Sequence, residues 1–269
     1  MVFDKTGTLT EDGLTCNSSK IKKGRHFEKK IKAEDSIPLP QDVFIDKEIY
    51  TKNKEDSFLK YSEWMAACHQ VTVIRGNYYG DPLDVEMLKT IKWVMPENDE
   101  FSIENKNETF IYPPEIYKEL ENNPEKAAEL YRLKVVHKFD FSSALQRMSV
   151  VVSNSFNLTN QYTMYIKGSP EAIQKLWDES TYPRDYEQTF KKYTQKGLRV
   201  ISLAYKYLPK FDTEQAGDID RKHYETLKSF VFLGFLIFIN KLKPETKDAI
   251  KELQEGKFYS KSLQFIKII

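Results

Sequence analysis

The sequence predicts an α/β fold of the α+β kind, in which a mostly antiparallel sheet is flanked by helices. With 269 residues the chain is long enough to bury a sizeable core. Apolar residues recur at helical spacing in several segments, which predicts the helices. Other segments are rich in β-branched and aromatic residues and predict the strands: residues 134–141, 148–153, 162–167, 200–207 and 229–239.

Helices are expected before and between these strands. In residues 82–93, Asp81 is placed to cap the helix, and Pro82 suits its first turn. The other segments in which we expect helices are residues 58–70, 124–132, 170–177, 186–196 and 244–255.

Two polar stretches are expected to contribute little to the core. Residues 14–56 are polar and lysine-rich, which predicts an extended connection. Residues 98–107 are acidic and amide-rich, which predicts a surface loop.

Charge and cysteine content exclude several classes of function. The chain has 41 basic and 40 acidic residues, so we expect neither nucleic acid nor a strongly anionic surface as a partner. Cys16 and Cys68 lie far apart in sequence and give no disulfide framework, which indicates a reducing, cytosolic environment. His69 adjoins Cys68, but no second pair of such residues lies nearby to complete a metal site.

The longest apolar run, residues 230–239, is too short to cross a membrane. A transmembrane helix needs about twenty apolar residues. The β-branched and aromatic content of this run indicates a buried strand instead. No secretory signal precedes the first motif, so we expect that this polypeptide does not cross a membrane by itself.

The strongest local signal is Asp-Lys-Thr-Gly-Thr-Leu-Thr at residues 4–10. An aspartate carboxylate can attack a phosphoryl group and hold it as an aspartyl-phosphate. Gly7 would allow a phosphate to approach the backbone, and the Lys5 ammonium and the threonine hydroxyls could meet its oxygens. A lone aspartate before Lys-Thr-Gly is usually an ordinary turn. The full run resembles the phosphorylation signature of the P-type ATPases.

Further motifs strengthen this resemblance, in the order that the family has them and over nearly the whole chain. Residues 139–150 resemble the family's adenine-site strand, and residues 167–171 resemble its Lys-Gly-Ala-Pro-Glu motif with serine in place of alanine. Residues 196–200 resemble the segment that brings an arginine to the phosphates. Markers similar to those of the type-V branch (P5, P5B-like) stand at residues 67–69, 80–84 and 240–246.

The resemblance implies a fold of two domains. Residues 15–233 would form the nucleotide-binding (N) domain, inserted into a phosphorylation domain with a haloacid-dehalogenase-like (HAD-like) fold. Residues 1–14 would start that phosphorylation domain, and residues 234–269 would return into it in truncated or divergent form. The function implied is ATP hydrolysis through an aspartyl-phosphate, coupled to transport across a membrane.

The resemblance also implies the phosphorylation site. Asp4 would be the nucleophile, and Lys5 and Thr6 would contact the transferred phosphoryl group. Asp4 and Thr6 would also hold Mg²⁺. A dehalogenase-type phosphatase is an alternative, but such enzymes usually carry a second aspartate where this chain has Thr6.

Three other residues are implied to bind ATP. Phe141 would stack on adenine, Lys167 would line the adenosine pocket and Arg199 would hold the polyphosphate. Each also has a simpler interpretation. Phe141, like Phe139, could be a core residue, Lys167 a solvated strand end or a local partner of Glu171, and Arg199 a surface arginine.

The sequence departs from the family at its C-terminal end. It contains neither the Thr-Gly-Asp segment nor the Gly-Asp-Gly-x-Asn-Asp segment that completes the Mg²⁺ site, and it drifts from the family pattern after Glu255. Ile239 stands where type-V members usually carry glutamate. We therefore expect a fragment that is inactive alone. The parent protein would lie in an endomembrane with this part in the cytosol, and a catalytically inactive nucleotide-binding module is the alternative.

Overall fold

A large antiparallel sheet organises the computed structural model, which describes residues 2–11, 13–28, 30–32, 39, 43–97, 108–156, 161–211, 220–256 and 261–263. Within these ranges the strands of the sheet follow the order β3-β2-β12-β11-β10-β9-β8-β7, and β4 also pairs with β2. The five predicted strands are confirmed: β8 (Leu133–Ser142), β9 (Arg147–Asn154), β10 (Tyr162–Gly168), β11 (Arg199–Leu208) and β12 (Val231–Ile239). The remaining strands are β2 (Thr15–Lys23), β3 (His26–Phe27), β4 (Ile31–Lys32) and β7 (Thr109–Ile111).

The prediction that residues 14–56 form a connection with little core is wrong over β2. This strand pairs with β12 on one side and with the short strands β3 and β4 on the other, so it is a full member of the sheet. Its buried positions include Cys16, Ser18, Ser19 and Ile21, so small polar side chains fill places where apolar ones were expected. Burial of a hydroxyl is tolerated when it is hydrogen-bonded. Ser19 meets this condition through the hydroxyl of Tyr61.

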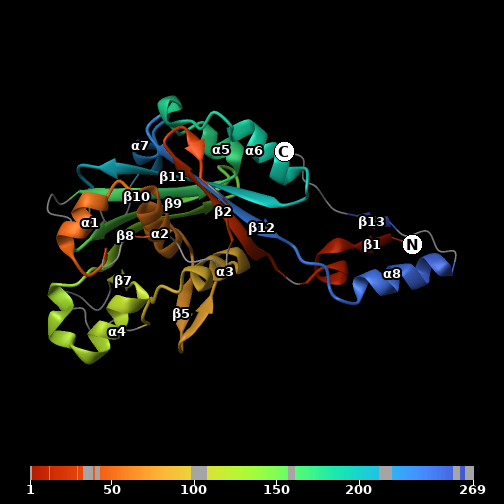
Figure 1. The fold of residues 1–269 in the computed structure, drawn as a ribbon, viewed down its shortest axis with the longest axis horizontal. Coiled ribbons are helices and arrows are strands. Elements are labelled where there is room, and N and C mark those ends of the chain that lie inside the picture. Colours follow the sequence, from red (N-terminus) through yellow and green to blue (C-terminus); the bar gives the residue numbers. More distant parts are fainter. Residues whose placement is uncertain are drawn as a thin grey trace.

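Helices cover both faces of the sheet (Figure 1). On one face lie α1 (Lys47–Asn53), α2 (Ser57–Ala67) and α3 (Pro82–Ile91), and on the other lie α5 (Pro170–Gln174) and α6 (Tyr186–Thr194). The side chains of β10 alternate between these layers, as the two-residue repeat of a strand requires. Tyr165 packs in the cluster with α2 and α3, whereas Met164 and Ile166 pack in the cluster with α5 and α6.

Helix predictions were accurate where the apolar spacing was clear. The helices α2, α3, α5, α6 and α8 (Thr246–Glu255) coincide, apart from a few residues at their ends, with the predicted segments 58–70, 82–93, 170–177, 186–196 and 244–255. The Asp81 carboxylate accepts a hydrogen bond from the Leu83 N–H at 2.9 Å, so the predicted cap of α3 is also confirmed. Residues 124–132 form only a short 3-10 turn, at Pro124–Ala128. Three further features were not predicted from the sequence: α4 (Pro114–Asn122), α7 (Arg221–Tyr224) and the hairpin of β5 (Thr72–Ile74) and β6 (Asn77–Tyr79). Residues 98–107, the expected surface loop, lie outside the described ranges.

Two short strands, one early and one late in the sequence, pair with each other away from the large sheet. Strand β1 (Val2–Asp4) pairs in parallel with β13 (Lys261–Leu263), and Figure 1 shows both beside α8 at one end of the molecule. The backbone of Lys5–Leu9 forms a helical turn directly after β1. This turn contacts the start of α8, because the Thr246 hydroxyl donates to the Leu9 carbonyl at 2.7 Å.

The expected boundary at residue 234 falls within a strand. Strand β12 continues through this position to Ile239 and stays paired with β2 and β11 on either side of it. A boundary at residue 234 would therefore divide a strand of the sheet. The division into two domains remains a prediction. Across the described residues, no helix is long and apolar enough to span a membrane.

Candidate nucleotide-binding site

A pocket opens where the ends of β10 and β11 meet α3 and the β8–β9 hairpin. Its volume is about 320 Å³. It brings together the three residues that the sequence analysis assigned to ATP: Phe141, Lys167 and Arg199. The full lining is Gln70, Asp81, Leu83, Asp84, Phe141, Gln146, Met148, Lys167, Gly168, Ser169, Arg199, Val200 and Ile201.

Phe141 offers an exposed ring to this pocket. Its side chain is 54% exposed, whereas Phe139 is 6% exposed and packs in the core. A β-bulge separates the two phenylalanines, because Phe139 pairs with Ser149 and Ser142 pairs with Arg147. A bulge breaks the two-residue alternation of side chains. Therefore Phe139 is a core residue, and Phe141 has the free face that stacking on a base requires.

Lys167 lies buried in the pocket wall with a carboxylate beside it. Its ammonium donates to Asp84, and both side chains are less than a tenth exposed. The other oxygen of Asp84 accepts the Gln70 N–H at 2.9 Å. Lys167 is thus neither a solvated strand end nor a partner of Glu171, which is exposed. Removing one partner of a buried ion pair leaves a charge uncompensated and typically costs about 3–5 kcal/mol.

Gly168 and Ser169 explain the shape of the pocket next to Lys167. A Cβ at Gly168 would lie 2.4 Å from the carbonyl oxygen of Gln146, so only glycine lets β10 end this close to the start of β9. Ser169 then caps α5, because its hydroxyl accepts the Ala172 N–H at 3.2 Å. The same hydroxyl donates to the Gln146 side chain at 3.1 Å. The strand, the turn and the helix are therefore fixed together.

Arg199 brings a second positive charge to the pocket, and none of the ion pairs among the described residues involves it. It begins β11 two residues after Gly197, whose φ of +71° makes a tight turn favourable for glycine. Its side chain is exposed and lines the pocket. Since the ammonium of Lys167 is already paired with Asp84, Arg199 is better placed to meet an anionic group.

The Cys68 and His69 side chains are inert core groups. The His69 ring donates from Nε2 to the Ala66 carbonyl at 2.7 Å and accepts the Val71 N–H at Nδ1, at 3.2 Å. Both ring nitrogens are therefore used. Burial, together with the positive Lys138 and Lys167, lowers the pKa of His69 to about 3. Burial raises the pKa of the Cys68 thiol to about 12.

The structure describes only the backbone of the expected phosphorylation site. Asp4 ends β1, and the turn after it includes Gly7 at a φ of +79°. The side chains of Asp4, Lys5 and Thr6 lie outside the described part of the chain. Their roles toward phosphate and Mg²⁺ stay predictions.

Several residues of this pocket could not be identified from the sequence. Asp84 falls in the helix predicted over residues 82–93, and nothing local indicates that Lys167, near the end of a distant strand, meets it. Gln70 was overlooked, although its side chain donates to Asp140 at 2.8 Å and accepts the Phe141 N–H at 3.3 Å. Met148 and Leu83 give the pocket its apolar surface. Met148 lies opposite Lys167, because β9 pairs with β10. The pairing of these two predicted strands was the one signal in the sequence that could have placed Met148 in the pocket.

Comparison with known proteins identifies the family. A family model described as the cytoplasmic domain N of P-type ATPases matches residues 5–245. The chain is 34% identical over 254 residues to the probable cation-transporting ATPase 13A4 of Gallus gallus, which covers 93% of this chain and 18% of that protein. It is 33% identical over 279 residues to the vacuolar cation-transporting ATPase YPK9 of Saccharomyces cerevisiae, covering 95% of this chain and 18% of that protein.

A third relative agrees with the other two. The polyamine-transporting ATPase 13A3 of Mus musculus is 33% identical over 268 residues, which cover 94% of this chain and 20% of that protein. The chain therefore spans about a fifth of the length of these curated relatives. Because the family model covers most of the chain and the relatives match nearly all of it, the chain belongs to the P-type ATPases, within the type-V (P5B) branch, and carries the cytoplasmic N domain of that family.

Proposed function

We propose that the pocket binds ATP. The observation that carries this proposal is the convergence of Phe141, Lys167 and Arg199, from three separate strands, on one pocket of about 320 Å³. Phe141 would stack on the adenine, and Met148 and Leu83 would form the apolar floor beneath it. Pockets for small ligands combine an apolar lining with a few polar groups in this way.

The charges of the pocket give Lys167 and Arg199 different tasks. The Lys167 ammonium shares its charge with Asp84, so it offers a fixed hydrogen-bond donor beside the nucleoside. Arg199 has an exposed guanidinium whose planar fork suits two phosphate oxygens. The nucleoside would therefore lie toward Lys167 and the polyphosphate toward Arg199.

The whole protein, we infer, hydrolyses ATP through phosphorylation of Asp4 and couples this reaction to transport across a membrane. The backbone supports this inference, because β1 pairs in parallel with β13 and Asp4 ends β1. In α/β sheets, ligands bind beyond the carboxyl ends of parallel strands. The parallel pair would be the start of the HAD-like domain.

A carboxylate and a hydroxyl are oxygen ligands that suit Mg²⁺, so Asp4 and Thr6 would hold it. The relatives are named as cation- or polyamine-transporting, and we propose a cargo of this class.

Binding of ATP to the 269-residue chain tests the proposed pocket. In a calorimetric titration, Phe141→Ala should weaken ATP binding by about 1–3 kcal/mol, the usual contribution of an aromatic ring stacked on a base. Ile45→Ala is a matched control. The exposed fraction of Ile45 is 53%, close to the 54% of Phe141, but Ile45 does not line the pocket. Equal affinities of the parent and Phe141→Ala would exclude the proposed role of Phe141.

Phosphorylation is tested separately from binding. A chimera that continues this chain with the segment that follows it in the 13A3 relative should incorporate acid-stable phosphate from ATP. The same chimera with Asp4→Asn should incorporate none. A chimera that binds ATP but is never phosphorylated would favour a nucleotide-binding module without turnover.

A further inference from the structure

The backbone around Phe141 is irregular, and this irregularity directs the ring. Strands β8 and β9 pair at Phe139–Ser149 and again at Ser142–Arg147, so two residues of β8 lie opposite Met148 alone. Bulges of this kind often re-aim a side chain at a functional site. Among the described residues, Phe141 makes no aromatic-pair or cation–π contact, and the path of its backbone sets the direction in which its side chain leaves the strand.

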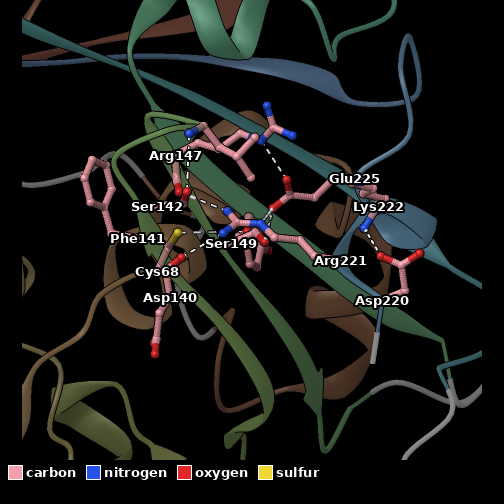
Figure 2. A network of polar contacts seen from close by, with 12 residues as sticks. Cys68, Asp140, Phe141, Ser142, Arg147, Ser149, Asp220, Arg221, Lys222 and Glu225 are labelled. Carbon is pink, nitrogen blue, oxygen red and sulfur yellow. Dashed lines mark hydrogen bonds and ion pairs between the residues drawn. The ribbon is translucent and has the colours of Figure 1, made fainter. Parts of the chain in front are cut away.

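One guanidinium spans this bulge from the far side of the hairpin. Arg221 lies in the short helix α7, and its Nη1 donates to the Asp140 carbonyl at 2.8 Å. Its Nη2 donates to the Arg147 carbonyl at 2.9 Å. Figure 2 shows the guanidinium between the two strands, next to the backbone that carries Phe141. A single side chain thus ties the two strands of the hairpin together, at Asp140, which precedes Phe141, and at Arg147, which pairs with Ser142.

A buried carboxylate holds this guanidinium in place. Glu225 accepts the Arg221 Nε–H at 2.7 Å and the Arg147 Nε–H at 2.6 Å. It also accepts the Ser149 hydroxyl at 2.7 Å, and its side chain is fully buried. Arg221 therefore uses Nε, Nη1 and Nη2 at once, which fixes the plane of its fork.

The opposite side of the bulge is held by Gln70. Its side-chain amide donates to the Asp140 carboxylate and accepts the Phe141 N–H. Consequently, residues 70 and 221, far apart in sequence, fix the same two-residue bulge. Such an arrangement sets the position of a ring before any ligand arrives, which lowers the entropy lost on binding.

We propose that Arg221 and Glu225 are positioning residues that hold Phe141 in the orientation that stacks on adenine. This inference rests on the proposed ATP site. Arg221 acts through the backbone of the bulge, because its contacts are to the carbonyls of Asp140 and Arg147. Its loss should therefore affect recognition of the base and leave recognition of the phosphates unchanged.

Two ligands separate this role from a general structural one. ATP and inorganic tripolyphosphate are titrated into the 269-residue chain and its variants. Arg221→Ala should bind ATP about threefold to a hundredfold more weakly, the range for coupled neighbouring residues. Its affinity for tripolyphosphate should match that of the parent. Lys222→Ala is the matched control, because it removes an equal charge from the same short helix and Lys222 is exposed.

Arg221→Lys keeps a positive charge beside Glu225, so it tests the positioning role in a variant that is expected to stay folded. A lysine has one donor atom and does not span two carbonyls while also pairing with Glu225. It should therefore weaken ATP binding in a chain that melts near the parent temperature. If Arg221→Lys binds ATP as tightly as the parent, the positioning role is wrong.

A double-mutant cycle with Phe141→Ala completes the test. If Arg221 acts through Phe141, Arg221→Lys should weaken ATP binding in the parent and have almost no further effect once Phe141 is alanine. Additive losses, or an equal loss of tripolyphosphate binding, would overturn the inference. Failure of the proposed function looks different: the parent would not bind ATP, or Phe141→Ala would bind it as the parent does.

Discussion

His69 shows how an environment decides the chemistry of a single residue. Next to Cys68 it resembles half of a metal site, yet its two ring nitrogens bond to the backbone at Ala66 and Val71. Burial and two nearby lysines keep the ring neutral and lower its pKa to about 3. A histidine held neutral in the folded chain makes the stability depend on pH.

We expect this histidine to weaken the fold in acid. Between pH 6.5 and 3 the unfolded chain binds a proton at His69 and the folded chain does not, so stability falls as pH falls. The loss from pH 7 to 4.5 should be about 2–3 kcal/mol. Urea unfolding at both values should show a smaller pH dependence for His69→Gln. The exposed His26→Gln serves as the control, and an unchanged pH dependence in His69→Gln would contradict the assignment.

At the scale of elements, β10 and the turn after it shape the pocket. Lys167 is the second-last residue of the strand, Gly168 ends the strand and permits the close approach to β9, and Ser169 caps α5. Three consecutive residues thus provide a side chain that lines the pocket, the close spacing of two strands and the cap of a helix. The serine, which replaces the alanine of the family motif, adds the hydrogen bond of the cap.

Gly168→Ala should disturb the pocket more than the addition of one methyl group would suggest. The added methyl group would meet backbone atoms of Gln146 and Arg147, which cannot turn away as a flexible side chain could. We expect a loss of about 1–3 kcal/mol of stability and weaker ATP binding. Ser169→Ala provides the comparison, with a loss of about 1 kcal/mol and ATP binding retained. Thermal unfolding and titration measure both, and a Gly168→Ala variant that equals the parent would refute the packing argument.

Elements with distinctive composition could be predicted, and those whose burial depends on distant partners could not. The strands β8 to β12 carry β-branched and aromatic residues and were found. Strand β2 was missed because its buried places hold Ser18 and Ser19, which look like loop residues until Tyr61 and β12 cover them. Likewise, α2 buries Lys60 and Glu63 as an ion pair at 3.0 Å, which no local pattern announces.

The candidate site could likewise be predicted only where a sequence motif marked its residues. Phe141, Lys167 and Arg199 were found by their motifs, and the structure brings them to one pocket. Asp84, Gln70 and Arg221 act through contacts with residues more than sixty positions away in sequence, so their roles required the fold.

At the scale of the whole molecule, the large sheet and a smaller terminal unit differ in how extensively each is packed. The terminal unit consists of β1, the turn Lys5–Leu9, α8 and β13. Among the described residues, β1 pairs with β13 alone, and a two-stranded sheet is marginally stable in water. The large sheet instead has helices on both faces and two buried clusters.

Limited proteolysis should therefore remove the two ends first. We expect early cleavage outside residues 15–239 and a resistant fragment that retains β2 to β12. Mass spectrometry of the fragments identifies the cut sites, and ATP should slow later cleavage within the fragment. Resistance of α8 and β13 equal to that of the sheet would show that the terminal unit is independently stable.

The pairing of Thr15 with Ile239 has a consequence for how this unit joins its surroundings. The chain enters the sheet along β2 and leaves it along β12, and these two points are directly opposed in neighbouring antiparallel strands. Opposed residues in such strands lie about 5 Å apart. A domain that carried residues 15–239 as an insertion would therefore meet them as if they were one tight hairpin, and its own strands would not need to separate. The same proximity would allow circular permutation: the two points could be joined by a short linker and new ends opened at the exposed turn between β5 and β6.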